Sequence, residues 1–286
     1  HGHHNKDYKN KWIEIYKLNK KIPDSLRIKV YGIDKIQDIE ITQNHLNILF
    51  KELNISVKIP KQKDEFIQWG SNNLIKLIAT IPRDSVNTNL IEDILHIRKN
   101  LVAYSTKSRE TIMFSNFNVF YKRYNLKGQK IYGYFGEAHV LQKEMNQIKD
   151  FGALIKQSNL PINNKTYTII SRYLNSYMAA PSKFLPPSIK DETEHTRMSI
   201  TSDNCFLLYH YGINDLKKVT KENTNTYFDI NNKNSPYKNS LRLIKSLGFY
   251  TLMSGMKITD KRTSTTDYAQ AIILIRNSDW AEPMKE

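Results

Sequence analysis

The feature that most constrains the fold is a short apolar run that ends at a glycine and leads into an amphipathic segment. Residues 130–136 are rich in Ile, Tyr and Phe and end at Gly136, which is typical of a β-strand that stops at a turn. Residues 140–155 then show a helical period. In open α/β sheets, ligands bind where the carboxyl ends of strands pass into helices. Glu137 and His139, which follow the glycine, are therefore the first candidates for a functional site.

The rest of the chain alternates in the same way, and its order of segments predicts the fold class. We predict an α/β protein with a mainly parallel sheet flanked by helices, as a single domain over residues 1–286. A long helical insertion, residues 42–125, separates the first two strands. Residues 179–203 are rich in proline and polar residues and are predicted to form a long loop. Helices are expected around residues 12–18 and over 42–53, 64–81 and 89–124, and strands over 27–34, 166–171, 204–210 and 268–276.

Composition limits the classes of partner. Lys and Arg outnumber Asp and Glu by 43 to 28, but the excess is spread along the chain, whereas a nucleic-acid footprint is clustered. The sequence therefore argues against a nucleic-acid partner and favours a small-molecule substrate. No apolar run approaches the roughly 18 residues of a membrane span. The single cysteine, Cys205, excludes an intramolecular disulfide and is predicted to be a small core residue. Compartment and oligomeric state do not follow from the sequence.

A second acid ends the first predicted strand. If the strands that end at Asp34 and before Glu137 run parallel, as their separation by helices suggests, Asp34 and His139 lie at the same sheet edge. Each acid also has a structural interpretation. Asp34 is equally suited to capping a turn or the next helix, and Glu137 to the first turn of a helix, where acids are favoured anyway.

A third group of polar residues falls on a predicted helix. Positions 109, 113, 116 and 120 share one helical face, so Arg109 and Asn116 interrupt an otherwise apolar stripe. Buried polar groups need partners, from the protein or from a ligand. Arg109 is suited to clamping a carboxylate, phosphate or developing oxyanion, or to fastening its helix to Glu137 or Asp34. Asp34, Glu110 and Asn116 are the candidates for substrate binding.

These motifs together resemble the erythromycin esterase-like family, which is related to the ChaN-like haem-uptake and Tiki-type proteins. The resemblance rests on Arg109-Glu110-x-x-Met113-x-x-Asn116, on Gly136-Glu137-Ala138-His139 and on Val30-Tyr31-Gly32-Ile33-Asp34. The segment from Asp267 to Ser278 resembles the closing strand of that family. The similarity follows the order of the chain from about Trp12 to Ser278.

The resemblance implies a parallel-sheet α/β core and hydrolysis of an ester or related acyl bond by activated water. It makes His139, Glu137 and Arg109 the catalytic candidates, with Glu137 holding the imidazole or binding the attacking water. The family's N-terminal Gly-Glu-x-x-His-Gly strand is not found here. The chain is therefore expected to be a fragment that begins downstream of that strand, or a divergent member without the chemistry. The alternative function is a non-catalytic small-molecule-binding protein on the same fold.

Metal-free hydrolysis is favoured over metal dependence, and no cofactor is assigned. Imidazole and carboxylate side chains suit a divalent cation, but the visible candidates are only His139, Glu137 and, less directly, Asp34 or His210. His210 ends an apolar run and is interpreted as a near-core histidine.

Overall fold

The computed structural model describes residues 5–254, 258, 260 and 262–284. The chain divides into two compact units. The first unit, here called the sheet unit, consists of residues 1–30 and 133–286. The second, called the helical unit, consists of residues 31–132.

The helical unit is built from helices that begin at polar caps. The Asp38 carboxylate accepts from the backbone N–H of Ile41, and Ser108 Oγ accepts from that of Thr111. Asp84 Oδ1 accepts two such bonds at the start of its own helix. These side chains satisfy amide groups that a helix leaves unpaired at its N-terminus. The helices are α2 (Ile39–Glu52), α3 (Lys63–Ile78), α4 (Ser85–Ala103) and α5 (Arg109–Arg123).

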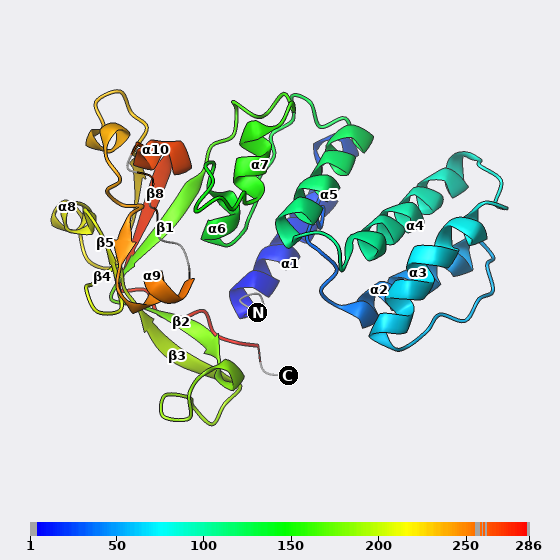
Figure 1. The fold of residues 1–286 in the computed structure, drawn as a ribbon, viewed down its shortest axis with the longest axis horizontal. Helices are drawn as coiled ribbons and strands as arrows, with labels where there is room; N and C mark the ends of the chain where they lie inside the picture. Colours follow the sequence, from blue (N-terminus) through cyan, green and yellow to red (C-terminus); the bar gives the residue numbers. More distant parts are fainter. Residues whose placement is uncertain (1–4, 255–257, 259, 261, 285–286) are drawn as a thin grey trace. The chain divides into compact units, whose positions relative to one another are not determined.

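The core of the helical unit lies between α2, α3 and α4, which run side by side in blue, cyan and teal in Figure 1. Its most deeply buried side chains come from all three helices and include Leu46, Phe66, Leu74, Ile94 and Leu101. Gly70 lies where α3 approaches α4, and a Cβ atom there would lie 2.4 Å from the end of the Leu101 side chain, which would have to shift. The unit thus has a hydrophobic core of its own.

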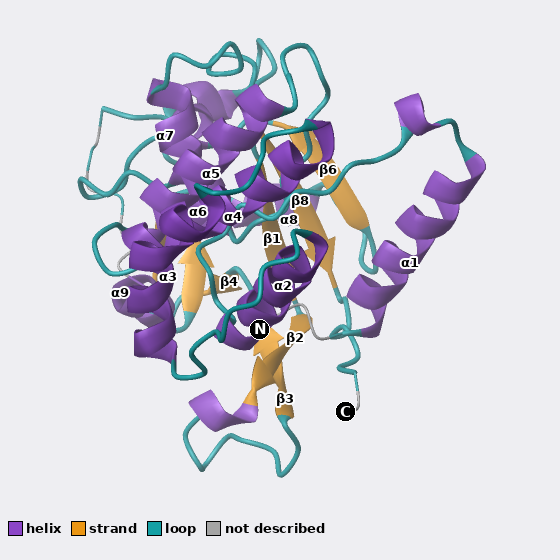
Figure 2. Cartoon of the chain, turned by 90° about the vertical axis from the view of Figure 1, so that its right-hand side faces the viewer, coloured by secondary structure: helices purple, strands orange, loops and turns teal. Residues whose placement is uncertain are grey.

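The sheet unit contains small sheets rather than one large one. Among the described strands, β1 (Ile169–Leu174) pairs in parallel with β8 (Ala271–Arg276), and β8 pairs antiparallel with β6 (Asn225–Asp229). Figure 2 shows these three strands together. The remaining pairs are antiparallel: β2 (Ser176–Pro181) with β3 (His195–Ile200), and β5 (Leu208–His210) with both β4 (Asp203–Asn204) and β7 (Ser246–Leu247).

The parallel pair supplies the centre of this unit's core. Alternate residues of β1 point inward, namely Ile170, Arg172 and Leu174, and they stand opposite Ile272, Leu274 and Arg276 of β8. Around them lie short helices. These are α6 (Glu137–Val140), α7 (Phe151–Gln157), α8 (Ile213–Lys218), α9 (Phe249–Ser254) and α10 (Thr265–Tyr268), with 3₁₀ turns at Asp24–Leu26, Ser182–Phe184 and Pro236–Asn239.

The long helix of the sheet unit, α1 (Lys6–Lys21), contains no buried residue. It confirms the helix expected around residues 12–18. Across the parts of the chain that the structure describes, none of the helices has both the length and the apolar character needed to cross a bilayer.

The predicted fold class is wrong. The sheets have three, two and three strands and are mixed or antiparallel, so there is no mainly parallel sheet flanked by helices. The helices predicted over 42–53 and 64–81 are confirmed by α2 and α3. The long helix over 89–124 is two helices, α4 and α5, with a turn between them.

The strands predicted over 27–34 and 130–136 are also absent. Their backbone groups bond to other parts of the chain or face solvent, instead of pairing with a neighbouring strand. In the segment 27–34, the Asn19 side chain accepts from the Ile28 N–H at 2.8 Å and donates to the Ile28 carbonyl at 2.9 Å. In the segment 130–136, Tyr132 and Tyr134 are 91% and 75% exposed. An apolar alternation forms a strand only where a neighbouring strand supplies hydrogen-bond partners.

Three further predictions need correction. The helix over 140–155 is interrupted, because the Gln142 N–H bonds to the Tyr268 carbonyl instead of a helical one and Asn146 has a positive φ of 49°. The predicted loop 179–203 contains most of the β2–β3 hairpin. Cys205 is exposed rather than part of the core, since it lies in the turn between β4 and β5. The strand predicted over 166–171 is present three residues further along as β1, and those over 204–210 and 268–276 are present in shorter form as β5 and β8.

Candidate functional site

The α6 turn carries the first two candidate residues and is tied to the sheet by an ion pair. Glu137 is the first residue of α6, and its two carboxylate oxygens accept from Arg172 Nη1 at 2.6 Å and Arg172 Nη2 at 2.9 Å. The Arg172 side chain is 1% exposed, whereas that of Glu137 is 29% exposed. A buried guanidinium in the middle of β1 therefore holds a carboxylate that still reaches the surface.

Arg172 has no donor left for a ligand. Its Nε and Nη2 donate to the Leu243 carbonyl, and its Nη1 donates to the Ser171 carbonyl. With the two bonds to Glu137, these contacts account for all five N–H groups of a guanidinium. Arg172 is thus an anchoring residue, while the Glu137 carboxylate keeps lone pairs that the Arg172 bonds do not use.

The charges of this pair contribute to pKa shifts of two neighbouring residues. Burial, followed by the positive charge of Arg172, lowers the pKa of His210 to about 2. His210 is therefore neutral, and its burial agrees with the near-core interpretation. Burial is also the main cause that raises the pKa of Tyr173, and the charge of Glu137 raises it further. Both groups are held in their uncharged forms beside the Arg172–Glu137 pair.

His139 follows Glu137 by two residues on the same short turn. Its backbone N–H donates to the Gly136 carbonyl at 3.1 Å, and its ring carbon Cδ2 would lie 3.7 Å from a Cβ atom placed on Gly136. Side chains two residues apart on a helix point in different directions. The carboxylate of Glu137 bonds to Arg172, so the structure gives it a different partner from the imidazole that the family resemblance implied.

Arg109 and Asp34 are partners in the helical unit. Arg109 Nε donates to Asp34 Oδ1 at 2.7 Å and Nη2 donates to Oδ2 at 2.5 Å. The hydrogen bond to Asp34 raises the pKa of Arg109. Of the two roles open to Arg109 on sequence alone, this geometry is that of the fastening role, joining α5 to the segment that precedes α2.

Asn116 makes a similar connection from the buried side of α5. It is 2% exposed, and its Nδ2 donates to the Ile33 carbonyl at 3.1 Å. Its amide also pairs reciprocally with that of Asn100 on α4, at 2.9 and 3.1 Å. Asn116 thus holds α4, α5 and the segment around Ile33 together. Glu110 lies in the first turn of α5, where a carboxylate is favoured.

The sheet edge that was predicted to bring Asp34 beside His139 does not exist, because neither of the two segments concerned is a strand. Asp34, Arg109, Glu110 and Asn116 belong to the helical unit, and Glu137 and His139 belong to the sheet unit. The physical reason is that neither segment 27–34 nor segment 130–136 has a neighbouring strand to pair with. Within the sheet unit, the candidate site therefore consists of Glu137 and His139 with their anchor Arg172.

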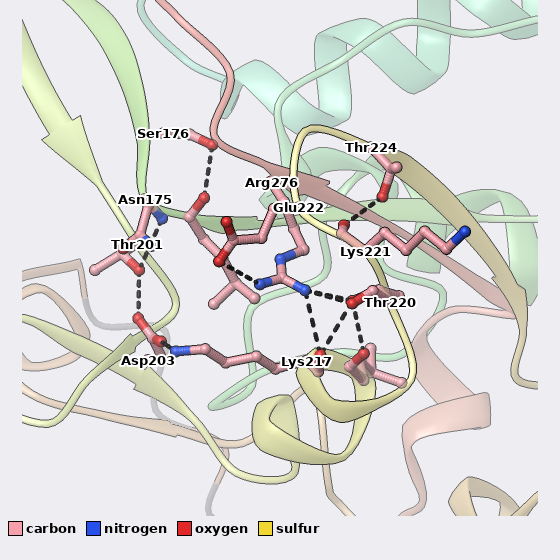
Figure 3. Close-up of polar contacts among 12 residues, drawn as sticks. Asn175, Ser176, Thr201, Asp203, Lys217, Thr220, Lys221, Glu222, Thr224 and Arg276 are labelled. Atoms are coloured by element: carbon pink, nitrogen blue, oxygen red, sulfur yellow. Dashed lines mark hydrogen bonds and ion pairs between the residues drawn. The ribbon is translucent and has the colours of Figure 1, made fainter.

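The carboxyl edge of the parallel pair holds another polar cluster, drawn in Figure 3. Arg276 ends β8, and its Nη1 donates to the carbonyl of Thr220 at 2.6 Å and to that of Lys217 at 3.3 Å. Nearby, Asp203 accepts from Lys217 Nζ at 2.6 Å. These contacts join β8 to the end of α8. Its contacts are all with protein groups, although the buried Arg276 Nε has no hydrogen-bond partner among the described residues, and we interpret the cluster as structural.

Arg172 was missed in the sequence, although a signal for it was present. It is the charged residue of the run Ile169–Leu174 and shares the inward face with Ile170 and Leu174. Because a charge on an inward strand position must be paired, the strand itself predicts a buried ion pair. The partner, Glu137, lies 35 positions away in the sequence, and only the folded chain identifies it.

No group of three or more His, Cys, Asp or Glu side chains converges as metal ligands would within the described ranges. Comparison of the chain with protein-family models, with curated proteins and with solved structures finds no match.

Proposed function

We propose that this protein is a hydrolase of an ester or related acyl bond and that the α6 turn of the sheet unit is its reaction centre. The sequence resemblance motivates the reaction class. The observation that carries the proposal is the bidentate pair between buried Arg172 and partly exposed Glu137. This pair fixes the start of the turn that presents His139, and preorganised groups are what water-activating sites require.

In the proposed reaction, the His139 imidazole takes a proton from a water molecule while the water oxygen attacks the acyl carbon. The tetrahedral intermediate then collapses, the bond to the alcohol oxygen breaks, and the imidazolium returns the proton to the leaving alkoxide. The products are a carboxylic acid and an alcohol. Glu137, held by Arg172, fixes the first residue of the turn from which His139 projects. Because side chains two residues apart on a helix point in different directions, His139 contacts the attacking water and Glu137 acts by positioning the turn.

The test is an assay of the full chain against a panel of activated and unactivated model esters. Because positioned acid–base groups contribute about 10²–10⁴-fold to a rate, His139→Gln is expected to lower kcat by about 100-fold or more. Glu137→Gln is expected to lower kcat less, because Glu137 positions the turn and does not itself take the proton. His45→Gln, on the helical unit, is the matched control and should leave the rate unchanged.

Two results would contradict the proposal. One is equal turnover by the original chain and by His139→Gln. The other is an absence of turnover on every ester together with saturable binding of one of them, which would identify a binding protein. Circular dichroism of each variant separates loss of the site from loss of the fold.

A further inference from the structure

A pocket of about 190 Å³ lies on the helical unit, lined by residues of α4, of α5 and of the turn between them. Its polar lining includes Arg98 and Lys99 from α4, Thr106 and Lys107 from the turn, and Ser115 from α5. The volume is below the roughly 300–1,000 Å³ of pockets for drug-sized ligands. The occupant is therefore a small group.

The cations at this pocket lack acidic partners in the described chain, although other cations of the same unit have them. Arg109 pairs with Asp34, and Arg123 pairs with Glu92 and Asp93. Three of the lining residues are cations and no carboxylate is among the described lining residues, so no acidic side chain of the lining offsets this positive charge, which favours an anion.

The positive charges near the pocket affect the pKa of one of its lining residues. Desolvation, followed by the positive charges of Lys107 and of Lys122 on α5, lowers the pKa of Lys99. A bound anion would reverse the contribution of the neighbouring cations. Because like charges are held together here at a cost, an anion in the pocket would relieve that repulsion.

The walls of the pocket are fixed by hydrogen bonds that leave donors available. Asn100 and Asn116 pair with each other across the helices and are 4% and 2% exposed. Arg98 Nε donates to the Ser71 carbonyl at 3.0 Å, so the side chain is held while its two terminal nitrogens make no bond in the described structure. A planar guanidinium with free terminal N–H groups suits the oxygens of a phosphate.

We propose that the pocket between α4 and α5 binds the phosphate group of a small phosphorylated molecule through Arg98, Lys99 and Lys107. Ser115 of α5 supplies a hydroxyl donor to the lining, whereas the Thr106 hydroxyl donates to the Val102 carbonyl at 3.5 Å. This site lies in the helical unit and does not depend on the reaction proposed for α6. The proposals of ester hydrolysis and of phosphate binding can therefore be tested independently of each other.

The proposal is tested by NMR titration of the ¹⁵N-labelled full chain with inorganic phosphate and with glycerol phosphate, against sodium chloride at equal ionic strength. The expected result is saturable shifts of amide signals from residues 98–116. Each lysine offers one charge-assisted hydrogen bond to the phosphate, so Lys99→Gln/Lys107→Gln is expected to weaken binding by about 100-fold or more. Tighter binding of glycerol phosphate than of free phosphate would indicate a phosphorylated metabolite, and the reverse order would indicate the free ion.

The matched control is Lys51→Gln/Lys76→Gln, which removes the same charge from α2 and α3 of the same unit. Neither lysine lines the pocket, so this variant should bind phosphate as the original chain does. Equal weakening in both double variants would mean that only net charge matters and would overturn the proposal. Unsaturable shifts spread over the whole chain would overturn it too.

Discussion

At the scale of single residues, the sheet unit depends on one buried charge. Arg172 occupies an inward position of β1 between the apolar residues Ile170 and Leu174, and it is stable there only because all five of its N–H groups are satisfied. A buried ion pair is a weak source of stability, but breaking it leaves an uncompensated charge in the core. The cost of a substitution therefore depends on which partner is removed.

Glu137→Gln should destabilise the protein by about 2–4 kcal/mol, somewhat less than a fully buried pair, because Glu137 is partly exposed. Unfolding in urea, followed by circular dichroism, measures the change. Glu14→Gln is the matched control, since Glu14 forms a surface pair with Lys17 at 2.8 Å. It should leave the free energy of unfolding unaltered. Similar costs for the two substitutions would show that Arg172 does not need Glu137.

His210 predicts a dependence of stability on pH. Its pKa is 6.5 in the unfolded chain and about 2 in the folded one, so only the unfolded state binds the proton between these values. Stability is therefore complete above pH 6.5 and falls as the pH is lowered. Between pH 7 and pH 5 the loss is about 2 kcal/mol, from 1.36 kcal/mol for each pH unit below 6.5.

The measurement compares urea unfolding at pH 7 and pH 5 for the original chain and for His210→Leu. The difference between the two chains isolates His210, because His96, whose pKa is also lowered chiefly by burial, is present in both. The same pH dependence in His210→Leu would exclude this account.

At the scale of elements, α6 and α7 are short helices whose position depends on a close backbone contact. A Cβ atom on Gly152, in the first turn of α7, would lie 2.4 Å from the Val140 carbonyl oxygen and 2.7 Å from that of Leu141. Both are backbone atoms at the end of α6, so they cannot move aside as a flexible side chain can. The glycine allows α7 to pack directly against the turn that carries Glu137 and His139.

Gly152→Ala is therefore expected to cost about 1–3 kcal/mol, the usual range for overpacking, and to lower any activity that requires the α6 turn. Gly32→Ala is the control, because nothing lies within 4 Å of a Cβ atom at that position. Thermal unfolding of both variants gives the comparison. If both are equally stable, α7 does not pack on α6 as described.

At the scale of the whole molecule, the chain consists of two units with separate cores. One apolar cluster lies in residues 31–132 and involves α2, α3 and α4, and another surrounds β1 and β8 in the sheet unit. The segment at the start of the helical unit is held within that unit, since the Tyr31 ring packs against Phe120 and Tyr124 at 5.4 and 4.7 Å between centroids.

Residues 31–132 should consequently fold when expressed alone, because a domain with its own hydrophobic core is able to do so. Far-ultraviolet circular dichroism should show a helical spectrum and a cooperative thermal transition. Leu74→Ala, at a fully buried position, should cost this fragment about 2–5 kcal/mol. A fragment without cooperative unfolding would show that the helical core requires the rest of the chain.

The sequence determined the helices of the helical unit. Periodic apolar residues are a local signal, and for this reason α2 and α3 were predicted close to their observed bounds, whereas the end of α4 and the cap of α5 at Ser108 were missed. The same reasoning placed β1 and β8, where long β-branched runs pair with each other. The sequence pattern also identified Asp34, Arg109 and Glu137 as polar residues that need partners.

Tertiary structure decided which segments became strands and which charges became partners. Residues 27–34 and 130–136 have the alternation of strands, but the Asn19 side chain takes the hydrogen bonds of Ile28 and no strand lies beside Tyr132. The position of Arg172 on its strand predicts a buried charge, but its partner Glu137 is distant in the sequence. A strand and an ion pair each need a second group brought close by folding, so a local pattern specifies only half of either interaction.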